Sequence, residues 1–300
     1  MNAGALIGLL VMIASEGATL GRIEPFYSWN TPIAWTGFIL FADSVVWRAR
    51  GRSWIRSSPL EFIFLALISI PLWLVFEFYN LYIDNWYYTG LPENFWLRQF
   101  GYAWSFATIW PAIFQAADLI DVWRSPSQLR SADLPDVYWV VSPAGRRLMI
   151  LIGLIFLAWP LLLPSPYLAA PVWLGFILLI DPINDRLGEP SLLGDAQKGD
   201  SRRTVNLVLG GFLCGVLWEF WNYWSGAKWH YTVPIMEHTK IFEMPLPGYF
   251  GFPAFALECF TMYVFARAIA VRVMPSLRGH FGHPIGFAAS AGPAKAGHYG

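Results

Sequence analysis

Charged residues are scarce in this chain. Of its 300 residues, 13% are Asp, Glu, Lys or Arg, whereas 56% are hydrophobic and 18% are aromatic. A soluble domain carries roughly 25% charged residues, so this composition excludes a domain that water surrounds on all sides. The formal net charge is zero, and the overall charge therefore gives no reason to expect a nucleic acid as a partner.

The chain also lacks the motifs of several enzyme classes. It contains no Walker loop, no GxGxxG nucleotide-binding turn, no GxSxG nucleophile elbow and no CxxC pair, so nucleotide-driven and flavin-dependent mechanisms are not expected. Cysteine is nearly absent. Cys214 and Cys259 both lie inside apolar stretches, where a thiol behaves as a small hydrophobic group. We therefore expect no cofactor.

Long apolar stretches are the dominant feature of what is present. They run for about 17–25 residues, long enough to cross a hydrocarbon core of about 30 Å as a helix. A membrane barrel would show alternating segments of about ten residues instead. The sequence therefore predicts an all-α integral membrane protein. We expect eight transmembrane helices, at about 4–20, 32–47, 60–80, 101–122, 147–163, 170–184, 204–222 and 249–271.

Basic residues gather on one side of these spans. Sixteen Lys and Arg follow the second, fourth, sixth and eighth spans, and the other side has four. The positive-inside rule places the richer side, and with it both termini, in the cytoplasm. The first span lacks the basic start of a cleaved signal sequence, so we expect it to be retained. The prediction is a multi-pass protein of the bacterial inner (cytoplasmic) membrane.

The two halves of the sequence repeat each other. Residues 35–43 and 173–181 are identical at six of nine positions, and Glu77-Phe78-Tyr79-Asn80 has its counterpart in Glu219-Phe220-Trp221-Asn222. Each copy contains four spans, an even number, so the copies should have the same orientation. We expect an axis along the membrane normal to relate them, with a ligand site at their interface.

This repeat divides the chain into four parts. We assign a first four-helix membrane repeat to 1–124, a polar linker rich in Pro and Ser to 125–145, and a second four-helix membrane repeat to 146–278. The remaining segment, 279–300, is rich in Gly, Ala, His and Pro, and this composition predicts a disordered tail.

Each repeat has an acid and an amide three residues apart in an apolar helix. Ionisable groups in a bilayer are costly and usually face a bundle interior or a wet cavity. We expect Glu77 and Glu219 to meet in a water-poor cavity between the repeats as catalytic acids, with Asn80 and Asn222 on the same helix faces as ligand contacts. Glu258 is a further catalytic candidate. The structural alternative is a hydrogen bond that joins the helices, on the order of 1 kcal/mol.

A loop rich in Trp and Tyr follows each of these helices. Trp and Tyr favour the membrane interface, so one interpretation is an interfacial belt. The other is a mouth that binds an apolar ligand with a polar end. Its candidate ligand contacts are Trp86, Tyr88, Trp229, His230, Tyr231 and Glu243. His and Glu residues in the second loop are of types that bind metals, but no tight motif such as HExxH is present, and we expect no metal site.

The second-repeat motif resembles the membrane domains of the heterodimeric or fused lycopene β-cyclases. Trp218-Glu219 is similar to the acid at a helix end in that family, Trp229-His230-Tyr231 to its aromatic loop, and residues 241–246 to the approach to its Glu-Glu pair. The resemblance covers roughly spans six to eight, and less closely spans two to four. The chain departs from the family at the pair itself, where it has Pro247-Gly248, so lycopene cyclisation would need another carboxyl group as the acid.

Three classes of function remain open. The resemblance implies an isomerase or lyase of carotenoid biosynthesis, and hence acid-catalysed cyclisation or isomerisation of an isoprenoid or carotenoid-like lipid without a redox cofactor. The second class is a non-catalytic membrane subunit that binds a pigment or lipid. The third is a small proton-coupled transporter in which paired acids carry protons. We expect a lipid or polyene as the partner and no nucleic acid. The sequence leaves the oligomeric state open.

Overall fold

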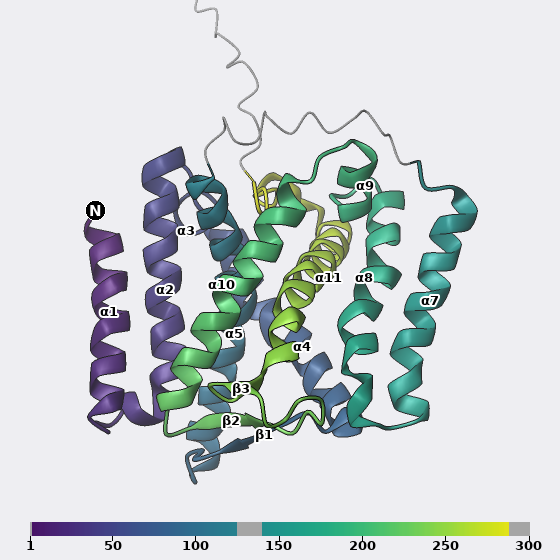
Figure 1. The fold of residues 1–300 in the computed structure, drawn as a ribbon. Helices are drawn as coiled ribbons and strands as arrows, with labels where there is room; N and C mark the ends of the chain where they lie inside the picture. The colour runs from purple at the N-terminus through teal and green to yellow at the C-terminus, as the bar shows by residue number, and fades with distance from the viewer. Residues whose placement is uncertain (1, 125–139, 288–300) are drawn as a thin grey trace, which may run out of the picture.

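Eight long helices make up most of the computed structural model, which describes residues 2–124 and 140–287 (Figure 1). Each of them falls on one of the eight predicted spans. The first half contains α1 (Ala3–Leu20), α2 (Phe26–Arg50), α4 (Pro59–Ile83) and α5 (Phe95–Trp123). The second half contains α7 (Pro143–Leu162), α8 (Ala169–Arg186), α10 (Arg202–Trp224) and α11 (Gly251–Val273).

Six of these helices are long and apolar enough to cross a membrane: α1, α4, α7, α8, α10 and α11. The apolar span of α8 begins at the preceding 3-10 turn η1 (Pro166–Leu168), and that of α11 begins at the 3-10 turn η2 (Leu246–Phe250). The chain is therefore a helical membrane protein. Helices α2 and α5 are long enough but contain buried polar groups such as Asp43 and Asp118. That these two also cross the membrane stays a prediction.

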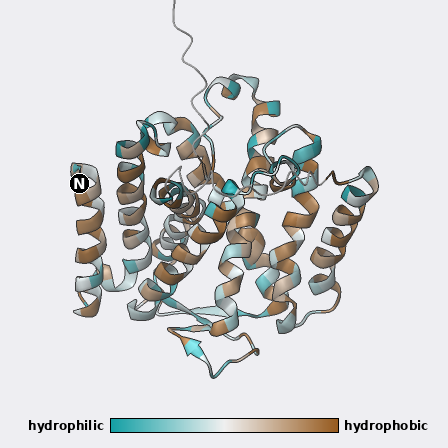
Figure 2. Ribbon diagram, turned by 45° about the horizontal axis from the view of Figure 1, so that its top comes forward, coloured by the Kyte–Doolittle hydropathy of each residue, from teal (hydrophilic) through white to brown (hydrophobic). Residues whose placement is uncertain are grey.

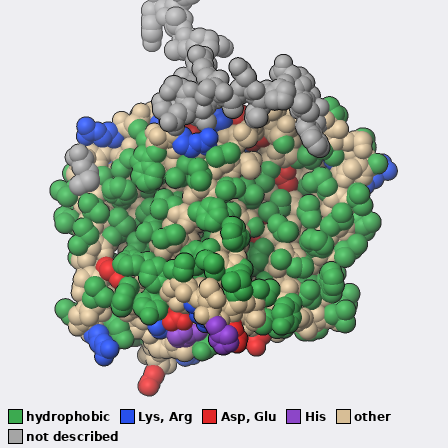
Figure 3. All heavy atoms as spheres, in the orientation of Figure 1, with side chains coloured by type: hydrophobic (Ala, Val, Ile, Leu, Met, Phe, Trp, Pro, Cys, Tyr) green, Lys and Arg blue, Asp and Glu red, His purple; other side chains and the backbone are tan. Residues whose placement is uncertain are grey.

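The outer surface fits this assignment. Large apolar side chains are exposed along the outer helices, for example Leu10 and Ile13 on α1 and Leu151 and Ile155 on α7. Apolar residues predominate along the lengths of the helices in Figure 2, and in Figure 3 charged side chains lie mainly near the two ends of the molecule. Hydrocarbon chains can solvate such a surface, whereas water cannot do so without cost.

Short elements lie at the two ends. Helices α3 (Trp54–Ser57) and α9 (Leu192–Gln197) lie at one end, and strands β1 (Trp86–Thr89), β2 (Lys228–Tyr231), β3 (Lys240–Ile241) and β4 (Met244–Pro245) lie at the other, which we call the strand end (Figure 1). The Asp43 carboxylate accepts a hydrogen bond from Ile55 N at 2.9 Å, and Asp181 accepts one from Leu193 N at 2.8 Å. Each acid thus fixes the short helix that follows its long one.

Glycine pairs let the outermost helices approach closely in both halves. A Cβ atom at Gly8 would lie 2.5 Å from the Gly37 carbonyl oxygen, and one at Gly153 would lie 2.8 Å from that of Gly175. Only glycine permits such contacts, and small residues are the usual means by which membrane helices pack backbone to backbone. The α1–α2 and α7–α8 pairs are therefore built in the same way.

Strands β1 and β2 pair across the two halves. Their antiparallel register places Trp86 opposite Tyr231, Tyr87 opposite His230, and Tyr88 opposite Trp229. A local two-fold axis through the central pair exchanges the residues that are equivalent in the two predicted repeats. The sequence predicted aromatic loops here and no strands, because four-residue strands gain their hydrogen bonds only from a partner far away in the chain.

Residues 280–287, which we expected to be disordered, are folded against the helices. Gly282 N and His283 N each donate a hydrogen bond of 2.8 Å to the Glu61 carboxylate, and Ile285 is buried. The His283 ring lies 4.1 Å from the Trp54 ring, centroid to centroid. The 3-10 helix η3 (Pro275–Gly279) leads into this segment. The rest of the predicted tail, 288–300, and the linker residues 125–139 lie outside the described residues.

Candidate functional site

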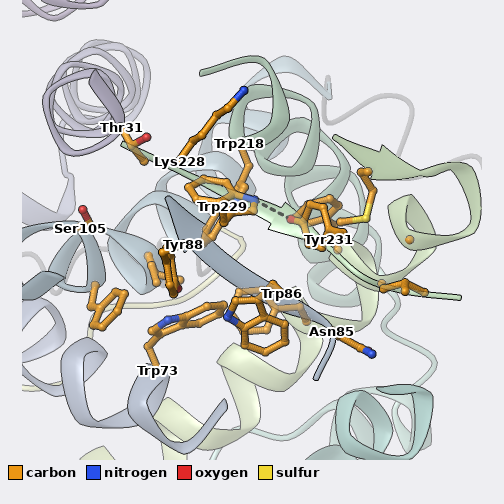
Figure 4. A pocket seen from close by; sticks show the side chains of 18 of the residues that line it. Thr31, Trp73, Asn85, Trp86, Tyr88, Ser105, Trp218, Lys228, Trp229 and Tyr231 are labelled. Atoms are coloured by element: carbon orange, nitrogen blue, oxygen red, sulfur yellow. Dashed lines mark hydrogen bonds between the residues drawn. The ribbon is translucent and has the colours of Figure 1, made fainter. Parts of the chain in front are cut away.

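A cavity of about 490 Å³ lies between the two halves, next to the β1–β2 pair. Its wall is aromatic and mostly apolar, and both halves contribute to it through α2, α4, α5, α8, α10 and α11. Among the described residues, seven tryptophans line it: Trp29, Trp35, Trp73, Trp86, Trp173, Trp218 and Trp229. Ligand pockets in proteins have volumes of roughly 300–1,000 Å³ and few polar groups, so this cavity is the candidate site (Figure 4).

The strand geometry decides which loop residues reach the cavity. Side chains two residues apart on a strand share a face. Trp86 and Tyr88 on β1 line the cavity, as do Trp229 and Tyr231 on β2. Between them, His230 and the Tyr87 ring stack at a centroid distance of 5.4 Å on the other face of the pair. Four of the predicted ligand contacts are thus brought together in one wall.

Glu77 lies behind this wall and is not among the residues that line the cavity. Its Oε1 atom accepts hydrogen bonds from Trp73 Nε1 at 2.8 Å, Trp86 Nε1 at 3.3 Å and the Tyr88 hydroxyl at 2.5 Å. All three donors belong to cavity-lining side chains. The acid therefore orients the rings, and the groups that would touch a ligand are indoles and a phenol.

Glu219 occupies the same place in the second half. Its Oε1 atom accepts a hydrogen bond from the Tyr231 hydroxyl at 2.8 Å, and Trp229 Nε1 donates to that hydroxyl oxygen at 2.9 Å. The Oε2 atom is buried without a hydrogen-bond partner in the described residues. We expected Glu77 and Glu219 to line a common chamber, and this expectation was wrong. A tyrosine side chain lies between each acid and the cavity.

Both phenols are held as hydrogen-bond donors. Burial, reinforced by the charge of Glu77 and the hydrogen bond to it, raises the pKa of Tyr88 well above its ordinary value. Burial and Glu219 raise the pKa of Tyr231 in the same way. The side chains therefore stay protonated under ordinary conditions, and each donates its single O–H group to the carboxyl group behind it.

Asn80 and Asn222 hold the strands in place. The Asn80 side chain accepts a hydrogen bond from Asn85 N at 2.9 Å and donates to the Trp86 carbonyl oxygen at 2.8 Å. Asn222 accepts from Trp229 N at 2.9 Å and donates to its carbonyl oxygen at 2.8 Å. Neither amide lines the cavity. The two Asn side chains therefore bind the backbone of the strands that form the wall, and they do not contact a ligand in the cavity.

His230 and Glu243 also lie outside the cavity lining. The His230 Nδ1 and Glu243 Oε2 atoms are 3.1 Å apart, and Lys228 Nζ is 3.2 Å from Glu243 Oε1. Burial alone would raise the pKa of Glu243, but the hydrogen bonds from His230 and Lys228 outweigh it and lower that pKa. In the described residues no group of three or more His, Cys, Asp and Glu side chains could hold a metal ion.

Glu258 is buried in α11, and neither of its carboxyl oxygens has a hydrogen-bond partner among the described residues. It does not line the cavity. A buried polar group without a partner costs about 1–3 kcal/mol. Nothing in its surroundings identifies what the carboxyl group does.

We expect Glu258→Met to raise the free energy of unfolding by about 1–3 kcal/mol, because it removes this unsatisfied group and keeps most of the volume. Thermal unfolding in detergent would show a rise of about 2–4 °C for each kcal/mol. Glu258→Gln, which keeps polar atoms there, is the matched control and should change little. A lower melting temperature for Glu258→Met would show that the carboxyl group has a partner.

Several lining residues were not predicted from the sequence. Trp35 and Trp173 both line the cavity, and they open the 35–43 and 173–181 segments that identified the repeat. Their equivalence was the signal that could have found them. Trp73 and Arg98 have no such counterpart, and no sequence feature marks them as part of the site.

Comparisons of the chain with protein-family models, with curated proteins and with solved structures found no match. The resemblance to the lycopene cyclase membrane domains therefore stays a prediction from short motifs.

Proposed function

We propose that this protein binds a chain-like apolar lipid of the isoprenoid class in the cavity and converts it to an isomer by proton transfer, without a redox cofactor. The observation that carries the proposal is an aromatic cavity faced by two phenol–carboxylate pairs, Tyr88–Glu77 and Tyr231–Glu219. A prenyl chain is apolar, and its double bonds are the groups that a proton donor could attack.

The proposed topology is eight spans in two tandem repeats of the same orientation, with a two-fold axis along the membrane normal. The register of β1 and β2, which pairs equivalent residues crosswise, supports such an axis. We place the α3 and α9 end in the cytoplasm and the strand end outside the inner membrane. The excess of basic residues on the first side supports this orientation.

The proposed chemistry uses one pair at a time. The carboxyl group reacts in its protonated form: it gives its proton to the phenol oxygen, and the phenol gives its own O–H proton to a carbon–carbon double bond, which leaves the carboxylate as the base. The resulting carbocation is stabilised by the faces of the surrounding indoles through cation–π attraction. It either closes a ring by forming a carbon–carbon bond or shifts its double bond. Loss of a proton from the neighbouring carbon back to the pair leaves a product of unchanged mass.

We expect Gly101→Leu to reduce the lipid that co-purifies with the protein at least about tenfold. Gly101 lines the cavity, and a Cβ atom there would have no neighbour within 4 Å, so the added side chain fills space that the ligand would use. Mass spectrometry of extracted lipids measures the effect. Gly17→Leu is the matched control, because a Cβ at Gly17 also meets nothing and this glycine of α1 is not part of the cavity.

Equal lipid content in the two variants would contradict the cavity as the binding site. Catalysis is tested separately, by incubating the protein with geranylgeraniol, a prenyl chain with a polar end, and with lycopene, a polyene without one. Chromatography should show an isomer of unchanged mass from at least one of them. Binding without any isomer would instead indicate a non-catalytic lipid-binding subunit.

A further inference from the structure

Part of the aromatic cavity wall matches between the two halves. Trp35 corresponds to Trp173, and the strand pairs Trp86–Tyr88 and Trp229–Tyr231 correspond to each other. If the whole wall followed this pattern, the cavity would suit a ligand with two similar ends. The remaining wall residues do not follow it.

The first half contributes hydroxyl groups where the second half contributes apolar side chains. At the offset that aligns Trp35 with Trp173, Thr31 corresponds to Ala169. At the offset that aligns Gly101-Tyr102 with Gly248-Tyr249, Ser105 corresponds to Phe252. All four of these residues line the cavity. Thr31 and Ser105 lie on the same side of it, across from Tyr231 (Figure 4).

The Thr31 hydroxyl is buried and has no hydrogen-bond partner in the described residues. A buried hydroxyl without a partner is costly. Because this one is part of the cavity wall, a polar atom of a bound ligand could satisfy it.

The first half also contributes an unpaired cation. Arg98 lies in the first turn of α5 and lines the cavity, and in the described part of the chain it has no carboxylate within ion-pair distance. Lys228, the other cation of the lining, is already paired with Glu243 at 3.2 Å. The second-half position that corresponds to Arg98 is Pro245. The first half therefore offers an unpaired positive charge and two aliphatic hydroxyl groups, and the corresponding second-half positions, Pro245, Ala169 and Phe252, offer neither.

We propose that the cavity binds an amphiphile with one anionic head in a single orientation. Arg98, Thr31 and Ser105 hold the head, a carboxylate or a phosphate, and the hydrocarbon body packs against Trp173, Phe252 and the other rings of the second half. A guanidinium pairs well with either oxyanion. This inference rests on the proposed function and narrows its substrate to a prenyl-type chain with an acidic end, so a hydrocarbon with two equal ends is a poorer ligand.

The test uses parinaric acid, a fluorescent polyene fatty acid, and its methyl ester, which has the same chain without the charge. Energy transfer from the cavity tryptophans reports binding of either probe at a pH at which the acid is ionised. We expect the acid to bind at least about tenfold more tightly than the ester. Arg98→Gln should reduce the affinity for the acid to that for the ester and leave the ester unaffected. Thr31→Val, which keeps the shape of the side chain, should lower the affinity for the acid severalfold.

Lys240→Gln is the control, because Lys240 is an exposed cation at the same end of the molecule and does not line the cavity. Competition by palmitate and by hexadecyl phosphate then distinguishes a carboxylate from a phosphate head. Equal affinities for acid and ester, unchanged by Arg98→Gln, would overturn the inference while the proposed function stands, provided that Gly101→Leu still abolishes binding of both probes. If Gly101→Leu leaves both probes bound, the proposed function itself fails.

Discussion

Tyr231→Phe is expected to slow lipid conversion by about 10²- to 10⁴-fold, which is the usual contribution of a positioned proton donor. The phenol lines the cavity and is the group through which Glu219 can reach a ligand. Phe keeps the ring and its packing, so only the O–H group is lost. The measurement is the rate of isomer formation from the converted lipid.

Glu219→Gln tests the role of the acid behind the phenol. Since Glu219 acts through Tyr231, we expect a comparable fall in the rate and a change in its pH profile, with lipid binding unchanged. Tyr88→Phe makes the same test in the first half and shows whether one pair or both pairs carry out the reaction.

Tyr87→Phe is the matched control for these variants. Tyr87 lies on the same strand as Tyr88, but it is half exposed and faces away from the cavity. The Tyr87→Phe variant should therefore convert lipid at the full rate. If the double variant Tyr88→Phe/Tyr231→Phe converts lipid as fast as the unmodified protein, the phenols are not the donors. An equal loss in Tyr87→Phe would mean that the effect is structural.

Glu61→Ala is expected to lower the free energy of unfolding by about 3–5 kcal/mol, because it leaves a buried cation without its partner. The Glu61 carboxylate is fully buried, and it accepts hydrogen bonds from the Tyr263 hydroxyl and from Arg267 Nη1, each at 3.1 Å. It also accepts the two backbone N–H groups of Gly282 and His283 at 2.8 Å. The variant would therefore release the 280–287 segment as well.

Reversible unfolding in mixed micelles measures this cost. Glu189→Ala is the control, because Glu189 forms an ion pair with Arg272 at 3.2 Å whose side chains are 27% and 45% exposed. Exposed pairs contribute about 0–1 kcal/mol. Glu61→Gln keeps one hydrogen-bond acceptor, and its loss of unfolding free energy should lie between those of Glu61→Ala and Glu189→Ala. Equal effects of Glu61→Ala and Glu189→Ala would show that the buried cluster does not hold the segment.

The sequence by itself determined where the long helices run. Each apolar stretch has the length that a membrane helix needs, and a helix in lipid satisfies its own backbone hydrogen bonds. The prediction therefore did not depend on contacts between distant residues. The predicted repeat also pointed to four residues that line the cavity, Trp86, Tyr88, Trp229 and Tyr231.

Only the tertiary structure decided what those residues do. A helix pattern gives the face of Glu77 and Glu219 but not the rings that cover that face, so the sequence could not show that tyrosines separate the acids from the cavity. The pairing of Tyr87 with His230 and the binding of residues 282 and 283 by Glu61 join parts of the chain that are 143 to 222 residues apart. These hydrogen bonds form only once the helices have packed, because each group finds its partner in a distant segment of the chain and not in its own.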